Sequence, residues 1–386
     1  MPDTDQPIAG YNGLTHVEPT LPTHFYLDED HYEQELRQIW YRNWLYVCRA
    51  SDLVGPRAFR VFEIGSQQIL ILRDEENELR AFHNTCRHRG SILAQESQGR
   101  FRSSMIICPY HAWGYDLCGN LKKTPTRHPQ PDFHKEDYSL YGVGIRDWNG
   151  FIFIHLDEAN AQPLEDSFND ANVLNHWDLS ELQIGHSHHK QLDCNWKVFW
   201  ENFNECLHCP NIHPELSRIV PLYKQYFMEV NDDPKWEEHQ KSGDLLYKAG
   251  LSQGNETWST TGEACTEYFP NLTQEEIKNG HTYCETLPSA FIVGHVDYVR
   301  VLRVLPIGPE RTDIFTQWLF RKETLEDASF SANAVTEFGE KVIEQDGFVA
   351  ELNQKGLHSI RHKQGTLMAE EYSVHDFHQW VKRQLD

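Results

Sequence analysis

Two histidines and a carboxylate lie within a strongly apolar segment in the middle of the chain. Residues 195–214 read NWKVFWENFNECLHCPNIHP and contain Glu205, His208 and His213 among aromatic and aliphatic side chains. Burying a charge or an unpaired imidazole is costly unless a partner or a metal ion satisfies it. Two histidines and one carboxylate on one face of an iron ion leave its other positions free for oxygen and substrate. The segment therefore predicts half of an iron site.

An acidic residue far along the chain is the best candidate for the third ligand. Asp346 lies in the segment KVIEQDGFVAEL, and on a helix it would share one face with Val342, Val349 and Ala350. An ionisable group would then point into the core, which favours a metal-binding role over that of an exposed acid. Glu340 and Glu344 are nearby rivals.

Two further side chains of the histidine segment could support such a site. Glu205 lies one helical turn before His208, where a carboxylate can accept a hydrogen bond from the ring of a metal-bound histidine; its alternative role is that of a surface acid. Asn202 could form a hydrogen bond near the metal or simply lie at a helix end. His208 and His213 are too far apart for the HExxH spacing of zinc proteases, and the nearby prolines would break the helix so that both rings converge.

A second constellation lies earlier, in the loops CRHRG and CPYHAW. Each loop supplies one cysteine and one histidine, namely Cys86 and His88, then Cys108 and His111. Zinc fingers usually pair Cys with Cys and His with His. The mixed pairs suit a [2Fe–2S] cluster in which two thiolates hold one iron and two imidazoles the other, the Rieske arrangement; a structural zinc site is the alternative. The remaining cysteines are expected to be small buried thiols: Cys48, Cys118, Cys194, Cys206, Cys209, Cys265 and Cys284.

With these motifs the chain resembles the α subunits of Rieske non-haem iron oxygenases, also called ring-hydroxylating oxygenases. The resemblance extends from IWYRNW through both Cys/His loops and NFNECLHCPNIHP to the C-terminal region. It implies that the two loops bind the cluster, that His208, His213 and Asp346 bind mononuclear Fe(II), and that Asn202 lies near this iron. Glu205 would bridge a cluster-binding histidine of one subunit and an iron-binding histidine of its neighbour. A homo-oligomer follows, with a trimer closed head to tail as the expected form.

The resemblance also implies an activity and partners. The chain would be the terminal oxygenase component that uses O₂ and electrons from NAD(P)H, delivered by a separate flavin-containing reductase, because no GxGxxG nucleotide motif follows a strand. The stretch ECLHCPNIHPEL resembles the bacterial branch that oxidises N-methyl groups of betaine, stachydrine and carnitine, although Leu207 stands where that branch often has an aromatic residue. We therefore expect monooxygenation and demethylation of a quaternary ammonium compound.

Alternative functions remain open at this point. Within the enzyme class, the chain could hydroxylate an aromatic ring or another small acid. It could also be a Rieske electron-transfer protein without oxygenase activity, or a zinc-binding interaction protein. A quaternary ammonium group favours a cage of aromatic rings, and four aromatic residues could contribute to one, although they equally fit a core: Trp258, Phe291, Tyr298 and Trp318.

The spacing of apolar residues predicts the helices and strands that position these motifs. Apolar residues at helical spacing predict a helix over about residues 28–40, with Asp28 or Asp30 near its start. Residues 59–84 alternate between apolar and polar and predict antiparallel strands, with turns at Gly65-Ser66 and at residues 75–77. Residues 297–322 predict two strands joined by a Pro/Gly turn, and residues 328–352 return to helical spacing.

The predicted fold class is α+β, with a small all-β Rieske [2Fe–2S] domain inserted in a larger domain that has a central antiparallel sheet flanked by helices. We expect an N-terminal arm and helix over residues 1–49 that pack on the catalytic domain. The Rieske domain is expected over residues 50–156, and the catalytic mononuclear iron domain over residues 157–386.

Bulk composition excludes several classes of protein. The chain has 386 residues with 35 basic and 58 acidic side chains, a formal charge of −23 that would repel nucleic acid. No apolar run is long enough to span a membrane, and the first residues lack the pattern of a secretory signal. A cytoplasmic location is expected, where cysteines are more often thiols or metal ligands than disulfides.

Overall fold

The structure, a computed structural model, describes residues 11–386 and contains two compact units. The first ten residues of the predicted N-terminal arm lie outside the described part. One unit comprises the described residues up to Ile39 together with Asp170–Glu285 and Ala290–Asp386. The other comprises Trp40–Asn169 and Thr286–Ser289. The prediction of an α+β fold with a small β domain is confirmed.

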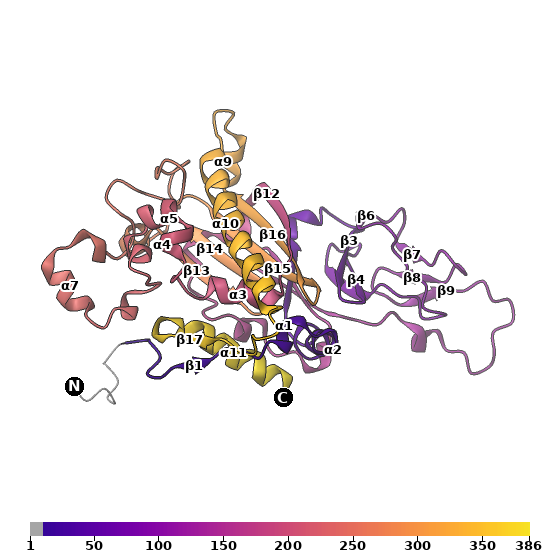
Figure 1. The fold of residues 1–386 in the computed structure, drawn as a ribbon. Helices are drawn as coiled ribbons and strands as arrows, with labels where there is room; N and C mark the ends of the chain where they lie inside the picture. The colour runs from indigo at the N-terminus through magenta and orange to yellow at the C-terminus, as the bar shows by residue number, and fades with distance from the viewer. Residues whose placement is uncertain (1–10) are drawn as a thin grey trace. The chain divides into compact units, whose positions relative to one another are not determined.

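The unit around Trp40–Asn169 contains three small antiparallel sheets (Figure 1). The first has the order β5-β4-β3-β6, formed by Leu79–His83, Gln67–Arg73, Ala58–Ile64 and Gln98–Arg100. The second, β7-β8-β9, is formed by Met105–Ile107, Gly114–Asp116 and Leu121–Lys123. The third, β10-β11-β2, is formed by Gly144–Trp148, Phe151–His155 and Leu45–Arg49. Positive φ angles at Gly65 and Asn77 mark the two predicted turns.

The larger unit is built on one antiparallel sheet of five strands, with the order β12-β16-β15-β14-β13. Along that order the strands are Gln183–Leu192, Arg311–Phe320, Val299–Gly308, Ala290–His295 and His281–Thr286. The predicted pair of strands joined by a Pro/Gly turn is β15 and β16. The histidine-rich strand β12 lies at the sheet edge, so one side of its backbone pairs with no strand among residues 11–386.

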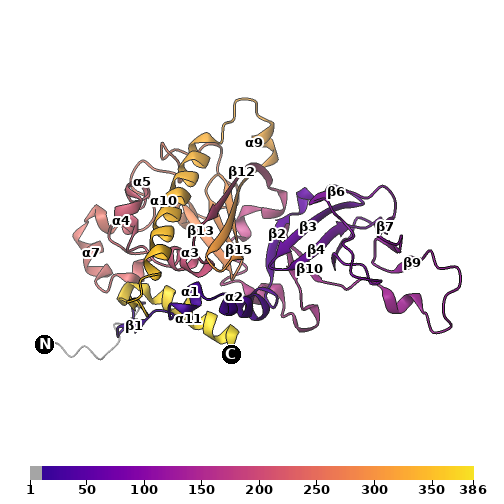
Figure 2. The same ribbon diagram turned by 45° about the vertical axis from the view of Figure 1, so that its right-hand side comes forward.

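Two helices cover one face of this sheet and position the larger unit's site. Helix α10, Asn333–Leu357, runs along the sheet next to β12 (Figures 1 and 2). At Gly339 a side chain would lie 2.7 Å from the Trp318 ring of β16, so glycine permits this close approach. Helix α3, Trp196–Phe203, contacts both α10 and β15. The predicted helix over residues 328–352 begins and ends five residues later, and Leu352, half exposed at 50%, is not a core residue.

The predicted N-terminal helix is present in two parts. Helix α2, Glu29–Glu35, begins at Asp28, whose side chain accepts a hydrogen bond from His31 N at 2.8 Å, and the chain continues as a π-helix to Trp40. Short helix α1, His24–Leu27, precedes it. Glu35 is fully buried and receives hydrogen bonds from Trp196 Nε1 at 2.8 Å and Lys197 Nζ at 2.5 Å. This ion pair attaches α2 to the start of α3.

Further helices and one pair of short strands complete the larger unit. They are helices α4 Cys209–Ile212, α5 Pro214–Ile219, α6 Pro221–Lys224, α7 Trp236–Ser242, α8 Gln274–Asn279, α9 Lys322–Glu326 and α11 Tyr372–Leu385, and the paired strands β1 Glu18–Pro19 and β17 Thr366–Leu367. None of the helices within residues 11–386 is both long and apolar enough to cross a membrane.

Candidate metal centres

The segment after helix α3 contains His208 and His213, the two histidines of the predicted iron site. Helix α3 ends at Phe203, and the chain then forms the short helices α4 and α5, each with a proline in its first turn. His208 precedes α4, and His213 lies between α4 and α5. The predicted break of the helix therefore occurs, and the two imidazole rings lie 5.2 Å apart between centroids.

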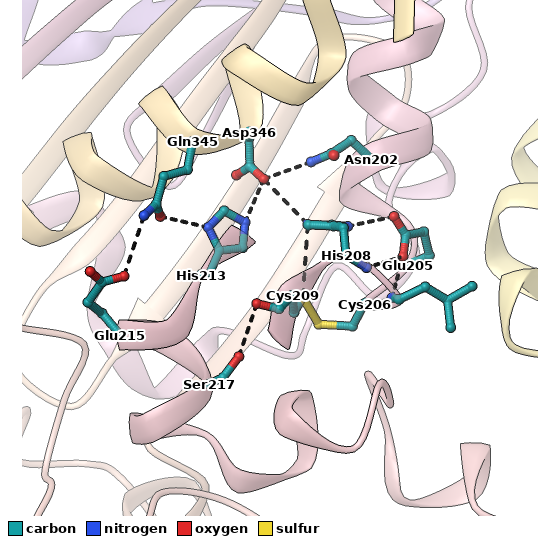
Figure 3. A network of polar contacts seen from close by, with 11 residues as sticks. Asn202, Glu205, Cys206, His208, Cys209, His213, Glu215, Ser217, Gln345 and Asp346 are labelled. Atoms are coloured by element: carbon teal, nitrogen blue, oxygen red, sulfur yellow. Dashed lines mark hydrogen bonds and ion pairs between the residues drawn. A yellow bond between two sulfur atoms is a disulfide. The ribbon is translucent and has the colours of Figure 1, made fainter. Parts of the chain in front are cut away.

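Asp346 of α10 meets both rings, as Figure 3 shows. Its Oδ1 lies 2.7 Å from His213 Nε2 and 3.4 Å from His208 Nε2. One ligand atom from each of the three residues lies within 4.8 Å of the other two, and residues 11–386 contain no other such group of three or more His, Cys, Asp or Glu side chains. The rivals lie elsewhere: Glu340 contacts His186 at 2.6 Å, and Glu344 pairs with Lys190.

The outer atoms of both histidines are held in a way that suits metal binding. His208 Nδ1 donates to Glu205 Oε1 at 2.5 Å, and His213 Nδ1 donates to Gln345 Oε1 at 2.8 Å. With the Nδ1 protons engaged, Nε2 is the ring nitrogen left for a metal ion. Two imidazole nitrogens and one buried carboxylate oxygen form the donor set of a non-haem iron site with open positions. These residues therefore fit a mononuclear iron.

The charges of this cluster balance one another. Burial alone would raise the pKa of Asp346, but hydrogen bonds from His208 and His213 hold it well below its usual value. Burial alone would lower the pKa of His208, but hydrogen bonds to Asp346 and Glu205 raise it to about 9. Asp346 is 4% exposed and His213 2%, so a carboxylate without these partners would be costly here.

Two further side chains, Asn202 and Glu205, contact the residues of this cluster. Asn202 Nδ2 donates to Asp346 Oδ1 at 2.8 Å and so fixes the carboxylate (Figure 3). Glu205 accepts hydrogen bonds from the backbone N–H groups of Leu207 and His208 through Oε2, which leaves Oε1 for the His208 ring. Sequence reasoning missed Gln345, although its position directly before Asp346 was a signal.

Cys206 and Cys209 form a disulfide, and the prediction of free thiols is wrong for this pair. The turn that carries His208 brings their Cα atoms to 4.9 Å, within the range that a disulfide bridges. Their CxxC spacing was the available signal, and the expectation of a reducing compartment outweighed it. The other seven cysteines form no disulfide in the described part of the chain.

The smaller unit brings its two Cys/His loops together. Cys86 and Cys108 are buried, at 3% and 2% exposure, whereas the rings of His88 and His111 lie towards the surface with centroids 4.7 Å apart. Burial raises the pKa of the Cys108 thiol, but backbone N–H groups of His111 and Tyr110 outweigh this and lower it. Gly90, with φ of +75°, closes the first loop in a conformation that favours glycine.

The donor set of these loops fits a two-iron cluster better than one zinc ion. Donors around a single zinc ion would lie within roughly 4 Å of one another. Within the described part of the chain, the four loop residues form no such single-ion group. Tyr115, which sequence reasoning missed, accepts from Arg87 N at 3.1 Å and can therefore donate its own proton to Cys86 Sγ, 3.3 Å away. Hydrogen bonds to the sulfur ligands help to set the potential of such clusters.

Comparison with known proteins gives matches over both units. Residues 43–134 match the family described as Rieske [2Fe-2S] domain, and residues 179–386 match the ring hydroxylating alpha subunit (catalytic domain). These two domains imply an iron–sulfur cluster and a mononuclear iron.

Curated relatives include three kinds of monooxygenase. The chain is 27% identical to the glycine betaine monooxygenase oxygenase subunit of Chromohalobacter salexigens, over 94% of this chain and 84% of that protein. It is 25% identical to the chloroplastic choline monooxygenase of Beta vulgaris, over 95% and 77%. It is 31% identical to the carnitine monooxygenase oxygenase subunit of Escherichia coli K12, over 53% and 54%.

Solved structures share the fold. A quaternary ammonium Rieske monooxygenase in complex with L-carnitine aligns with a TM-score of 0.70 at 23% identity, over 99% of both chains. Naphthalene 1,2-dioxygenase from Rhodococcus sp. aligns with a TM-score of 0.69 at 18% identity, over 95% of this chain and 94% of that one. At these identities the likeness concerns the fold alone.

Proposed function

Because the chain belongs to the ring-hydroxylating alpha subunit family and is a Rieske-type oxygenase, we propose that it oxidises an N-methyl group of a quaternary ammonium compound. The observation that carries this proposal is the convergence of His208, His213 and Asp346 in a chain whose curated relatives are betaine, choline and carnitine monooxygenases. In the reaction a methyl C–H becomes C–OH, O₂ supplies the oxygen atom, and two electrons with two protons reduce the second oxygen to water. The resulting hemiaminal releases formaldehyde.

We assign the site residues as follows. Residues 50–156 form the Rieske domain, in which Cys86, His88, Cys108 and His111 hold the cluster. In the catalytic domain, residues 157–386, mononuclear iron is held by His208, His213 and Asp346. When bound, the cluster supplies single electrons and the iron supplies dioxygen activation.

The chain's own residues orient this chemistry. Glu205 holds the His208 ring through Nδ1, and Asn202 holds Asp346 through Oδ1. Phe203 of α3 meets Phe291 of β14 edge to face, with centroids 5.3 Å apart, which places two aromatic side chains between helix and sheet. Such rings also suit a cationic ammonium group.

The proposal includes partners. NAD(P)H electrons reach the protein through a separate flavin-containing reductase, since this chain carries no nucleotide-binding motif of its own. The working unit is a homo-oligomer, with a trimer as the simplest closed form. In it Glu205 accepts a hydrogen bond from a cluster-binding histidine of a neighbouring subunit.

The test is oxidation by the purified enzyme with a surrogate reductase, NADH and O₂. Glycine betaine, carnitine, choline and an aromatic hydrocarbon serve as substrates, and formaldehyde, ring diol and oxygen uptake are measured. We expect formaldehyde in proportion to the oxygen consumed with a quaternary ammonium substrate. Diol formation without formaldehyde would assign the chain to aromatic ring hydroxylation instead, and reduction of the cluster without any coupled oxygen uptake would leave electron transfer as its role.

A further inference from the structure

A buried arginine of the larger unit, Arg300, forms no ion pair within the described residues. Arg300 lies on β15 and is only 5% exposed. In the described part of the chain its guanidinium forms no hydrogen bond or ion pair, and its one ring contact is with Trp258, at 5.9 Å from the centroid. Burying an unpaired charge is costly for the folded state. A side chain of this kind therefore calls for a negatively charged ligand.

The strand register places Arg300 on the face that carries the iron site. Arg300 is the cross-strand partner of Trp318, and the side chains of such a pair lie on the same face of a sheet. The Trp318 ring lies against Gly339 of α10, so this is the face that α10 covers. Burial lowers the pKa of Arg300, and the Asp346 carboxylate is among the groups that oppose this shift, so Asp346 is within electrostatic reach.

Near Arg300 lie buried polar atoms that can donate hydrogen bonds, together with His281 Nδ1 and both ring nitrogens of His295, which also lack a partner among residues 11–386. The indole nitrogens of Trp258 and Trp318 and the hydroxyl oxygen of Thr316 are buried without a partner. Thr316 lies two positions from Trp318 on β16 and so shares its face. An indole N–H and a guanidinium can only donate, and a hydroxyl can also donate. The ligand that matches them presents negatively charged acceptor oxygens.

The neighbouring titratable groups supply no such anion. Burial lowers the pKa of His281 to about 4 and that of His295 well below its usual value, so both imidazoles are neutral. Burial also raises the phenol pKa of Tyr223 and Tyr298, which keeps both uncharged. Asp346 is engaged by His208, His213 and Asn202.

We infer that Arg300 binds a carboxylate of the substrate, so that the substrate is a betaine-type zwitterion rather than a quaternary ammonium alcohol such as choline. A guanidinium forms paired hydrogen bonds with a carboxylate, which gives orientation as well as affinity. The carboxylate at Arg300 would hold the N-methyl groups on the side of the iron ligands. The inference rests on the proposed function for the oxidised group, whereas the carboxylate itself is argued from Arg300 and its neighbours.

The test compares two ligands that differ at one end. Binding of glycine betaine and of choline to the holoenzyme is measured anaerobically by calorimetry, for the wild type, Arg300→Gln, Arg300→Lys and the control Arg303→Gln. Arg303 lies three residues along β15, on the opposite face, so Arg303→Gln removes an equal charge from the same strand. We expect Arg300→Gln to weaken betaine binding about 30-fold or more and to leave choline binding unchanged or stronger.

The variants also report on folding. Arg300→Gln removes a buried unpaired charge, so its melting temperature without ligand should equal or exceed that of the wild type. Saturating betaine should raise the melting temperature of the wild type and of Arg303→Gln, but not of Arg300→Gln. Arg300→Lys keeps the charge without the planar fork and should show an intermediate loss of betaine affinity. It carries the comparison if the glutamine variant fails to fold.

The results separate the inference from the proposed function. Betaine affinity that is unaffected in Arg300→Gln, or wild-type binding of choline as tight as that of betaine, would overturn the role of Arg300, as would a wild type that binds no betaine. Formaldehyde release together with any of these three results would still support N-demethylation. Conversely, Arg300-dependent binding of betaine without any formaldehyde would keep the carboxylate site and refute the demethylation.

Discussion

Replacement of Asp346 by Asn tests the assignment of the mononuclear iron site. The change keeps the shape of the side chain but removes the anion whose Oδ1 meets His208 Nε2, His213 Nε2 and Asn202 Nδ2. Loss of a group that merely orients a metal ligand typically weakens metal affinity about 10- to 100-fold, and loss of a ligand itself should cost at least about 100-fold. We therefore expect Asp346→Asn to lose the mononuclear iron and with it the oxygenase turnover.

The assay is the iron content of each purified variant, together with the Rieske absorption and EPR spectra. A chain with a two-iron cluster and one mononuclear iron should hold about three iron atoms, and the variant about two, with unchanged cluster spectra. Glu344→Gln is the matched control, because Glu344 lies two residues earlier on α10, is 54% exposed at its side chain and pairs with Lys190. Its iron content should equal that of the wild type.

A variant with a smaller expected loss of iron affinity, Asn202→Ala, extends the same test. Asn202→Ala removes the amide that donates to Asp346 Oδ1 at 2.8 Å while all three ligands remain. Iron affinity, measured by titration with a competing chelator, should fall about 10- to 100-fold, between the control and Asp346→Asn. Full iron content and full turnover in Asp346→Asn would refute the assignment. Loss of the cluster spectra in that variant would show a general folding defect instead.

Three further experiments, two with substitutions and one with the unchanged protein, test other parts of the structure. Glu205→Gln should slow single-turnover oxidation by the pre-reduced enzyme about 10- to 100-fold with both cofactors retained, and an unchanged rate would argue against its role at the iron ligand. Glu35→Gln leaves the Lys197 ammonium buried without its anion and should lower the free energy of unfolding in urea by about 3–5 kcal/mol. Burial would raise the Glu35 pKa, but Lys197 lowers it overall, so the pKa of Glu35 is lower in the folded than in the unfolded protein. The stability difference between the wild type and Glu35→Gln is therefore fully present above the unfolded glutamate pKa of about 4.3, and it shrinks as the pH falls through the folded pKa of Glu35. Alkylation of the denatured protein before and after reduction should modify seven and then nine cysteines, with Cys206 and Cys209 as the additional pair detected by peptide mass spectrometry.

The parts of the protein that could be predicted from sequence are those that local patterns determine. Each cluster loop carries its cysteine and histidine within two or three residues between short strands, so the loop alone indicates the chemistry. The start of α2 at Asp28 follows in the same way from one capping side chain. The prediction of an all-β domain likewise needed only the alternation of β3, β4 and β5.

Asp346 shows how far periodicity reaches. It is 133 residues from His213, so spacing cannot connect the two. The helical pattern nevertheless placed Asp346 on the face of Val342, Val349 and Ala350; Asp346, Val342 and Ala350 are buried, and Val349 is partly buried. A carboxylate on that face needed a partner. The pattern could not identify which residues would meet it, because that depends on how α10 packs against α3.

Arg300 shows where sequence reasoning ends. Alternation along β15 places Arg300 and Arg303 on opposite faces, but it does not say which face a helix covers. That depends on the pairing with β16, and an irregularity between Pro306 and Gly308 shifts this pairing by one residue. The shift sets Arg300 opposite Trp318 rather than Leu319. Because a β-bulge near the end of the hairpin determines the neighbours of Arg300, its place beside the iron site, and the carboxylate it calls for, could emerge only from the three-dimensional structure.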